Sequence, residues 1–237
     1  TQSLLEAARR HGIRYHQIST CEVYGDLPLE TNDSFTEESP YRPRTPYNAS
    51  KAAADLVVGA YHHTFGVPTT ISVCSNNYGP WQFPEKVIAL FTTNAIDSIP
   101  LPLYRHSANR REWLHVDDHC RAIDTIIRRG RIGETYNVGS SDERSVEQIA
   151  DSILRLTGKP QTLKTYVEDR PSHDRRYLLD HSKIESELGW RPEVGFEDGL
   201  RETVAWYGTS REWWEPKRRA TLDEFAWNKK TPIESRK

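Results

Sequence analysis

The chain has 237 residues, a formal net charge of −2 and 36% hydrophobic residues, which is typical of a soluble globular protein with a substantial core. The near-neutral charge argues against a dedicated nucleic-acid binder, and no apolar run reaches the roughly 18 residues of a membrane span. Cys21, Cys74 and Cys120 are widely spaced without a C-x-x-C pattern. The sequence therefore predicts neither a disulfide framework nor a metal site, and a reducing, cytoplasmic setting fits best.

The start of the chain suggests that a segment precedes it. The sequence contains no Met, and an amphipathic helical pattern from Ser3 to His11 begins two residues after Thr1. Ser3 is a candidate N-cap and Gly12 a candidate stop for that helix. We therefore expect the chain to be the later part of a longer polypeptide.

Helical and strand patterns alternate along the first two thirds of the chain. Helices are predicted at 3–11, 47–65, 87–96, 117–129, 145–156, 182–188 and 196–207, and strands or extended segments at 14–18, 69–74, 100–104, 112–116 and 135–138. The β-branched run 69–74 is typical of a strand buried on both faces. This order predicts an α/β protein with a doubly wound parallel sheet. The charged tail beyond Pro216 is left without predicted structure.

Three polar clusters follow successive strands, at residues 19–26, 47–51 and 75–86. Ligands bind at the carboxyl edge of open parallel sheets, so we expect the clusters to converge there. Glu22, beside Thr20 and Cys21, is a candidate base for a carbon acid, although a surface carboxylate is about as plausible from the sequence alone.

Tyr47 and Lys51 lie one helical turn apart, on one face of the predicted helix 47–65. A nearby ammonium favours the phenolate, so we expect Lys51 to draw the pKa of Tyr47 below its ordinary value near 10. The pair is therefore a candidate for proton transfer. The spacing alone often arises by chance, and the alternative is a helix-start aromatic beside a solvated lysine.

Several basic side chains are candidates for binding an anion, because guanidinium groups bind phosphate oxygens in bidentate fashion. They are Arg111, Arg170, His173, Arg175 and Arg176. A solvated or ion-paired surface is the alternative for each arginine, and a loop hydrogen bond is the alternative for His173.

Six spaced motifs carry a resemblance to a known family: Ser19-Thr20-x-Glu22-Val23-Tyr24-Gly25-Asp26, Thr45-Pro46-Tyr47-x-x-x-Lys51, Cys74 to Pro80, Phe83-Pro84-Glu85-Lys86, Arg111-Glu112-Trp113-Leu114, and Arg170-Pro171-x-His173 to Tyr177. Together they resemble the dTDP-glucose 4,6-dehydratases, which are extended short-chain dehydrogenases/reductases. The resemblance runs from Thr1 to about Trp214.

The resemblance implies the later half of a Rossmann-type domain (1–77 and 113–140) and a smaller α/β lobe (78–112 and 141–237) that binds a nucleotide sugar. It implies NAD as cofactor, dTDP-glucose as substrate, and a homodimer formed through the helices at 3–11 and 47–65. The implied catalytic residues are Thr20, Cys21, Glu22, Tyr47 and Lys51, and Ser19, Tyr47, Lys51 and Cys74 are implied to contact the cofactor. Asn76, Lys86, Pro102, Tyr104, Arg111, Arg170 and His173 are implied to bind the substrate.

In the implied reaction, NAD accepts hydride from C4 of the glucose while Tyr47, assisted by Lys51 and Thr20, removes the hydroxyl proton. Glu22 then takes the C5 proton, water leaves from C6, and the hydride returns there. Cys21 occupies the position where the family has an aspartic acid that protonates the departing hydroxyl. A thiol is a weak hydrogen-bond donor, so elimination is expected to suffer.

Two alternatives remain open from the sequence. A related nucleotide-sugar epimerase, decarboxylase or ketoreductase needs Tyr47 and Lys51 but no acid at position 21. A non-catalytic remnant that binds a nucleotide sugar is the second, because the first strand of the Rossmann domain and its glycine-rich turn are not found in the sequence. On that basis NAD binding by the chain alone is expected to be poor.

Overall fold

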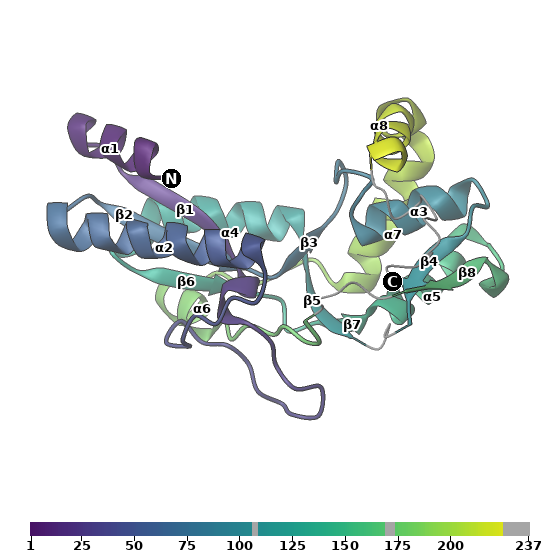
Figure 1. The fold of residues 1–237 in the computed structure, drawn as a ribbon, viewed down its shortest axis with the longest axis horizontal. Coiled ribbons are helices and arrows are strands. Elements are labelled where there is room, and N and C mark those ends of the chain that lie inside the picture. Colours follow the sequence, from purple (N-terminus) through teal and green to yellow (C-terminus); the bar gives the residue numbers. More distant parts are fainter. Residues whose placement is uncertain (106–108, 169–173, 225–237) are drawn as a thin grey trace, which may run out of the picture.

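Three parallel strands form the sheet of one half of the molecule (Figure 1). The computed structural model describes residues 1–105, 109–168 and 174–224. Strands β1 (Tyr15–Thr20), β2 (Thr69–Cys74) and β6 (Thr135–Val138) lie in the order β1-β2-β6. Cys74 is in register with Thr20 on one side and Val138 on the other, so all three strands end at the same edge.

Helices cover both faces of this sheet. Helices α1 (Gln2–His11) and α2 (Pro46–Phe65) enclose one apolar core with β1 and β2, whereas α4 (Val116–Arg129) and α6 (Ser182–Leu188) enclose another on the opposite face. The alternating layers confirm the predicted α/β fold. Burial on two sheet faces also explains why β2 reads as a continuous β-branched run without alternating exposed residues.

The helix that carries Tyr47 begins and ends where the sequence predicted, within one residue. Thr45 caps it by accepting a hydrogen bond from the backbone N–H of Asn48 at 3.2 Å, and Pro46 stands in its first turn. Gly66 ends it with a φ of 66°, a conformation that glycine adopts without strain. The predicted N-cap of the first helix was wrong, because α1 starts at Gln2, ahead of Ser3, and Thr1 makes no side-chain cap bond.

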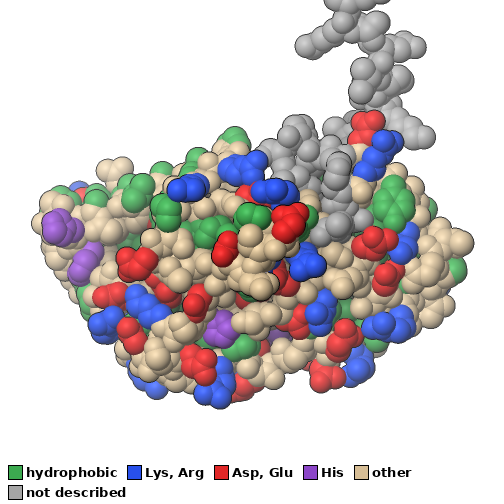
Figure 2. All heavy atoms as spheres, turned by 90° about the horizontal axis from the view of Figure 1, so that it is seen from below, with side chains coloured by type: hydrophobic (Ala, Val, Ile, Leu, Met, Phe, Trp, Pro, Cys, Tyr) green, Lys and Arg blue, Asp and Glu red, His purple; other side chains and the backbone are tan. Residues whose placement is uncertain are grey.

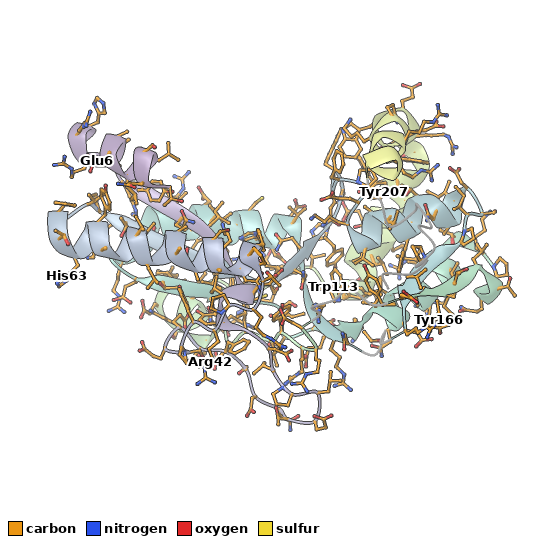
Figure 3. All side chains as sticks on the ribbon, in the orientation of Figure 1. Glu6, Arg42, His63, Trp113, Tyr166 and Tyr207 are labelled. Carbon is orange, nitrogen blue, oxygen red and sulfur yellow. The ribbon has the colours of Figure 1, made fainter. Side chains whose placement is uncertain are left out.

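The second half contains two small sheets and three packed helices. Strand β5 (Arg110–His115) pairs with β3 (Asn76–Tyr78) and β7 (Glu143–Ser145), and β4 (Leu101–Tyr104) pairs with β8 (Lys164–Val167), which follows the short helix η2 (Gln161–Leu163). Helices α3 (Val87–Ile96), α5 (Val146–Thr157) and α7 (Phe196–Thr209) share one apolar core with these strands. Trp113 lies where the two halves meet (Figure 3).

Three details differ from expectation. Helix α4 starts at Val116, one residue before the predicted start at 117, and it is capped by the His115 side chain. Helix α8 (Arg211–Glu224) continues through Pro216 into the segment left without predicted structure. Helix α6 packs on β6 and α4, although residues 141–237 were assigned to the substrate lobe; the domain boundaries themselves remain a prediction.

Among the described residues, no helix combines the length and apolar character needed to cross a membrane.

Candidate active site

Tyr47 and Lys51 lie at the carboxyl edge of the β1-β2-β6 sheet, in the first turns of α2. The Lys51 ammonium donates a hydrogen bond of 2.6 Å to the carbonyl oxygen of Ile18, near the end of β1. Tyr47 is 55% exposed. The helix therefore presents a phenol to the sheet edge and uses the lysine one turn later to hold the strand end.

The expected direction of the Tyr47 pKa was wrong. Partial burial raises the pKa of Tyr47 above its ordinary value of 10.0, and the nearby Glu22, Cys74 and Cys21 raise it further. The backbone brings η1, the end of β2 and the start of α2 together, because Thr20 is in register with Cys74, η1 starts at Cys21, and Lys51 binds the Ile18 carbonyl oxygen. The predicted convergence of these polar clusters at one edge is confirmed.

The residues after β1 form a tight turn that places Glu22 at this edge. The 3₁₀ helix η1 (Cys21–Tyr24) starts at once after the strand, and the Thr20 hydroxyl accepts from the backbone N–H of Glu22 at 3.4 Å. Cys21 is buried, and burial followed by the charge of Glu22 raises the pKa of its thiol well above 9.0. Cys21 is therefore a protonated thiol beside Glu22.

The two other residues predicted to contact the cofactor have internal partners. The Ser19 hydroxyl donates to Asp55 Oδ2, and the Cys74 thiol donates to the Ser19 carbonyl oxygen at 3.4 Å. Asp55 was not predicted as a site residue, although it stands four residues after Lys51 on the same helix face. Burial raises its pKa, opposed by Ser19 and by the charge of Lys51.

The loop after β2 carries two of the predicted substrate residues. Asn76 Oδ1 is buried and accepts no hydrogen bond from the described residues, so it is available to a ligand donor. Lys86 precedes α3 with its ammonium 2.9 Å from Glu85 and largely exposed. The side-chain amide of Gln82 holds the loop by donating to the Asn77 carbonyl oxygen at 2.7 Å.

Arg111 is the one predicted arginine whose described contacts suit a ligand-facing role. Its guanidinium stacks 4.7 Å from the ring centroid of Tyr177 and donates to the backbone oxygen of Asp174. Pro102 and Tyr104 are half-buried in β4, within the second half of the molecule. Arg170 and His173 lie outside the described residues.

The ion-paired alternative holds for two other arginines. Arg175 Nε lies 2.9 Å from Asp26 Oδ2. Arg176 is buried and makes a bidentate pair with Glu143, at 2.6 and 2.8 Å. These two guanidinium groups hold segments together, whereas the substrate-binding role of Arg111 stays a prediction.

A parallel sheet with a tyrosine and a lysine one helical turn apart at its carboxyl edge is typical of the extended short-chain dehydrogenases/reductases. The chain belongs to the GDP-mannose 4,6 dehydratase family, whose sequence profile matches residues 1–203.

Three individual relatives are similar to this chain over most of its length. A dTDP-glucose 4,6-dehydratase from Streptomyces niveus is 50% identical over 217 residues, which cover 91% of this chain and 64% of that protein. The structure of a dTDP-glucose 4,6-dehydratase from Bacillus anthracis in complex with NAD has a TM-score of 0.87 at 46% identity, covering 90% of this chain and 68% of that one. A UDP-glucose 4-epimerase from Thermus thermophilus, in complex with NAD, has a TM-score of 0.80 at 28% identity, covering 87% and 68%. This chain thus spans just under two thirds of the length of the first of these relatives.

Proposed function

We propose that the protein dehydrates dTDP-glucose to the 4-keto-6-deoxy sugar nucleotide, using NAD. One observation supports this most: the Lys51 ammonium binds the Ile18 carbonyl oxygen, which ties the helix that presents Tyr47 to the end of the strand that leads directly into Glu22. A dehydration of this kind needs two proton acceptors, one for the C4 hydroxyl and one for C5, within reach of one sugar ring. The two relatives named as dTDP-glucose 4,6-dehydratases point to the same substrate.

The residues at the sheet edge suit the sugar end of a dinucleotide. The Tyr47 phenol is half exposed there, and the Lys51 ammonium carries donors beyond its bond to Ile18, which suits ribose hydroxyls. NAD, when bound, supplies a hydride acceptor and later a hydride donor. Ser19 and Cys74 would support this site through backbone position, since their side chains have internal partners.

The chain's own residues divide the proton transfers. Tyr47 reacts as the phenolate, which the fixed Lys51 ammonium stabilises, and it becomes the neutral phenol when it takes the C4 hydroxyl proton. Glu22 takes the C5 proton that the C4 ketone acidifies. Cys21 would protonate the departing C6 hydroxyl, and it is buried and protonated but a weak donor.

Incubating the protein with dTDP-glucose and NAD tests the proposal. Mass spectrometry should show a sugar nucleotide lighter by one water. Recovery of unchanged dTDP-glucose, with NAD demonstrably bound, would contradict it.

Cys21 favours a second candidate, reversible oxidation at C4 without elimination. A buried thiol does not disturb hydride and proton exchange at C4, and a UDP-glucose 4-epimerase shares the fold at 28% identity. Formation of the C4 epimer, with no loss of water from the same substrate, would favour this candidate.

We also propose that two copies pair through α1 and α2. These helices lie side by side at one end of the molecule (Figure 1), joined by the Tyr61 hydroxyl donating to Glu6 at 2.8 Å. Leu4, Leu56 and Phe65 are each more than half exposed on them, and such apolar surface is typical of a protein interface. Light scattering should give a dimer for the wild type and a monomer for Leu56→Arg. An unchanged mass for that variant would exclude α2 from the interface between the two copies.

A further inference from the structure

Asp26 is an acid that four hydrogen-bond donors surround. It follows η1 by two residues, and its side chain is 4% exposed. Oδ2 accepts from Arg44 Nη1 and from Arg175 Nε, both at 2.9 Å. Oδ1 accepts from the backbone N–H groups of Arg175 and Arg176 at 2.5 and 3.1 Å. An ionised carboxylate has room for about four such donors, so both of its oxygens are fully used.

The donors come from two segments that are distant in sequence from Asp26 and from each other. Arg44 stands three residues before Tyr47, in the turn that leads into α2. Arg175 and Arg176 belong to the segment that ends the sixth sequence motif. Asp26 itself stands four residues after Glu22. The Asp26 carboxylate therefore links three segments. Its own segment carries Glu22, the proposed C5 base; the segment of Arg44 leads to Tyr47, the proposed C4 base; and the segment of Arg175 lies beside Arg111.

Backbone contacts show that these segments are fitted to each other. The Arg42 N–H donates to the Val23 carbonyl oxygen at 2.9 Å, and the Leu27 N–H donates to the Arg176 carbonyl oxygen at 3.1 Å. Gly25 has a φ of 98°, and a Cβ there would lie 2.8 Å from the Arg42 carbonyl oxygen. The chain therefore passes Arg42 too closely for any other residue at position 25.

The contact with the substrate side runs through Asp174. The Arg111 guanidinium donates to the backbone oxygen of Asp174, and the Asp174 carboxylate lies 3.5 Å from Arg44 and accepts from the Tyr177 hydroxyl. A shift of Arg175 would thus move the residue on which Arg111 rests. Figure 2, which views the molecule from the side of the 25–44 loop, shows acidic and basic side chains adjacent on this face.

We propose that Asp26 is a positioning residue, which fixes Glu22 and Tyr47 relative to the segment that supports Arg111 and so to the bound sugar. This inference rests on the proposed function. Asp26 does not touch the reacting atoms, and its effect passes through Glu22, Tyr47 and Arg111. Misplacement of a catalytic group by about 1 Å costs on the order of 10²-fold in rate, so loosening this junction should lower kcat as well as substrate affinity.

Asp26→Asn and Asp26→Glu test the proposal. An amide presents one acceptor oxygen and turns an N–H₂ group toward two donors, so it cannot hold both segments. Glutamate keeps the charge and both acceptor oxygens. The matched control is Asp124→Asn, which breaks an exposed pair with Arg128 at 2.8 Å on α4.

For Asp26→Asn we expect kcat for dTDP-glucose to fall at least tenfold and the Kd for dTDP to rise at least fivefold. Asp26→Glu should recover at least a third of the lost kcat, and the control should match the wild type. A folded Asp26→Asn protein with kcat and Kd within twofold of the wild type would overturn the proposal. If that variant does not fold, Arg44→Gln, at a half-exposed position, should show the same losses in smaller degree, and its full activity would equally overturn the proposal.

Hydrogen exchange separates this inference from the proposed function. In Asp26→Asn, the backbone amides of Arg175 and Arg176 and that of Arg42, which donates to Val23, should exchange at least tenfold faster than in the wild type, with the α4 amides unchanged. If the wild type makes no product from dTDP-glucose, the proposed function fails. Hydrogen exchange still shows in that case whether Asp26 holds the two segments in place. Unchanged exchange in both segments would show that Asp26 does not hold them.

Discussion

The Lys51 ammonium nitrogen lies 2.6 Å from the carbonyl oxygen of Ile18, so the helix that presents Tyr47 is tied to the strand that leads to Glu22. Asp55, one turn further along the same helix, accepts from the hydroxyl of Ser19, the next residue of that strand. Two successive residues of β1 are thus held by two side chains one turn apart on α2. The spacing of Tyr47, Lys51 and Asp55 by four residues puts all three on one helix face.

Asp55→Asn should be less active than the wild type without being less stable at neutral pH. Burial raises the pKa of Asp55 above its ordinary value of 3.8, in spite of the hydrogen bond from Ser19 and the charge of Lys51. A raised carboxyl pKa gives stability that is complete below the unfolded value and is lost as the pH rises through the folded value. The asparagine avoids that loss, but it weakens the charge-assisted bond to Ser19.

Thermal unfolding between pH 4 and pH 8 checks this prediction. The Tm of Asp55→Asn relative to the wild type should rise as the pH increases. The kcat of the variant should be lower than that of the wild type. A relative Tm that falls with increasing pH would mean that the ionised Asp55 stabilises the fold.

Tyr47→Phe should abolish turnover without affecting stability. The phenol is half exposed and the ring is retained, so the Tm should change by about 1 °C or less. Loss of a general base lowers rates by about 10² to 10⁴. Tyr166→Phe is the matched control, because Tyr166 on β8 is 52% exposed and donates to Glu147 far from the site (Figure 3). Equal activities of the two variants would remove Tyr47 from the mechanism.

The sequence predicted the elements better than the contacts between them. Strand β2 followed from its β-branched run, and helices α2, α3 and α6 followed from apolar periodicity and from stops such as Gly66, because those signals are local. The i, i+4 spacing from Lys51 could also have indicated Asp55. Asp26 appeared only as the last residue of the first motif, and nothing in the sequence indicated its partner Arg175, which lies 149 residues away.

The same reason explains the errors at the site. The ion pair between Arg176 and Glu143 is formed by tertiary packing, so the sequence could not separate Arg176 from Arg111. The raised pKa of Tyr47 depends on burial and on the side chains of η1 and β2, whereas the sequence showed only the lysine one turn away.

Cys21→Asp should raise the rate of elimination. The buried thiol at position 21 is protonated but donates weakly, whereas a carboxylic acid beside Glu22 is a competent general acid. We expect product formation from dTDP-glucose to increase by on the order of 10². Cys120→Asp, at the exposed cysteine of α4, should leave the rate unchanged. No increase for Cys21→Asp would mean that another group protonates the leaving hydroxyl or that elimination is not the reaction.

Glu112→Gln should destabilise the protein most at acid pH. Glu112 is fully buried between the two halves, where Oε1 accepts from the backbone N–H groups of Ser140 and Ser141, each at 2.7 Å, and Oε2 accepts from that of Leu179 at 3.1 Å. A glutamine must turn its N–H₂ group toward one of these donors, which costs about 1–3 kcal/mol.

The pH dependence of that loss follows from the titration of Glu112. Burial raises its pKa from 4.5 to about 7, although the bonds from Ser141, Ser140 and Leu179 oppose the rise. The wild type therefore has its full stability below pH 4.5 and loses part of it as the pH rises toward 7, whereas the glutamine does not titrate. The difference in Tm between wild type and Glu112→Gln should narrow from pH 5 to pH 8. Glu197→Gln, at an exposed pair with Arg155, should show no such trend. A difference that widens with pH would mean that the three backbone N–H groups hold Glu112 ionised in spite of its burial.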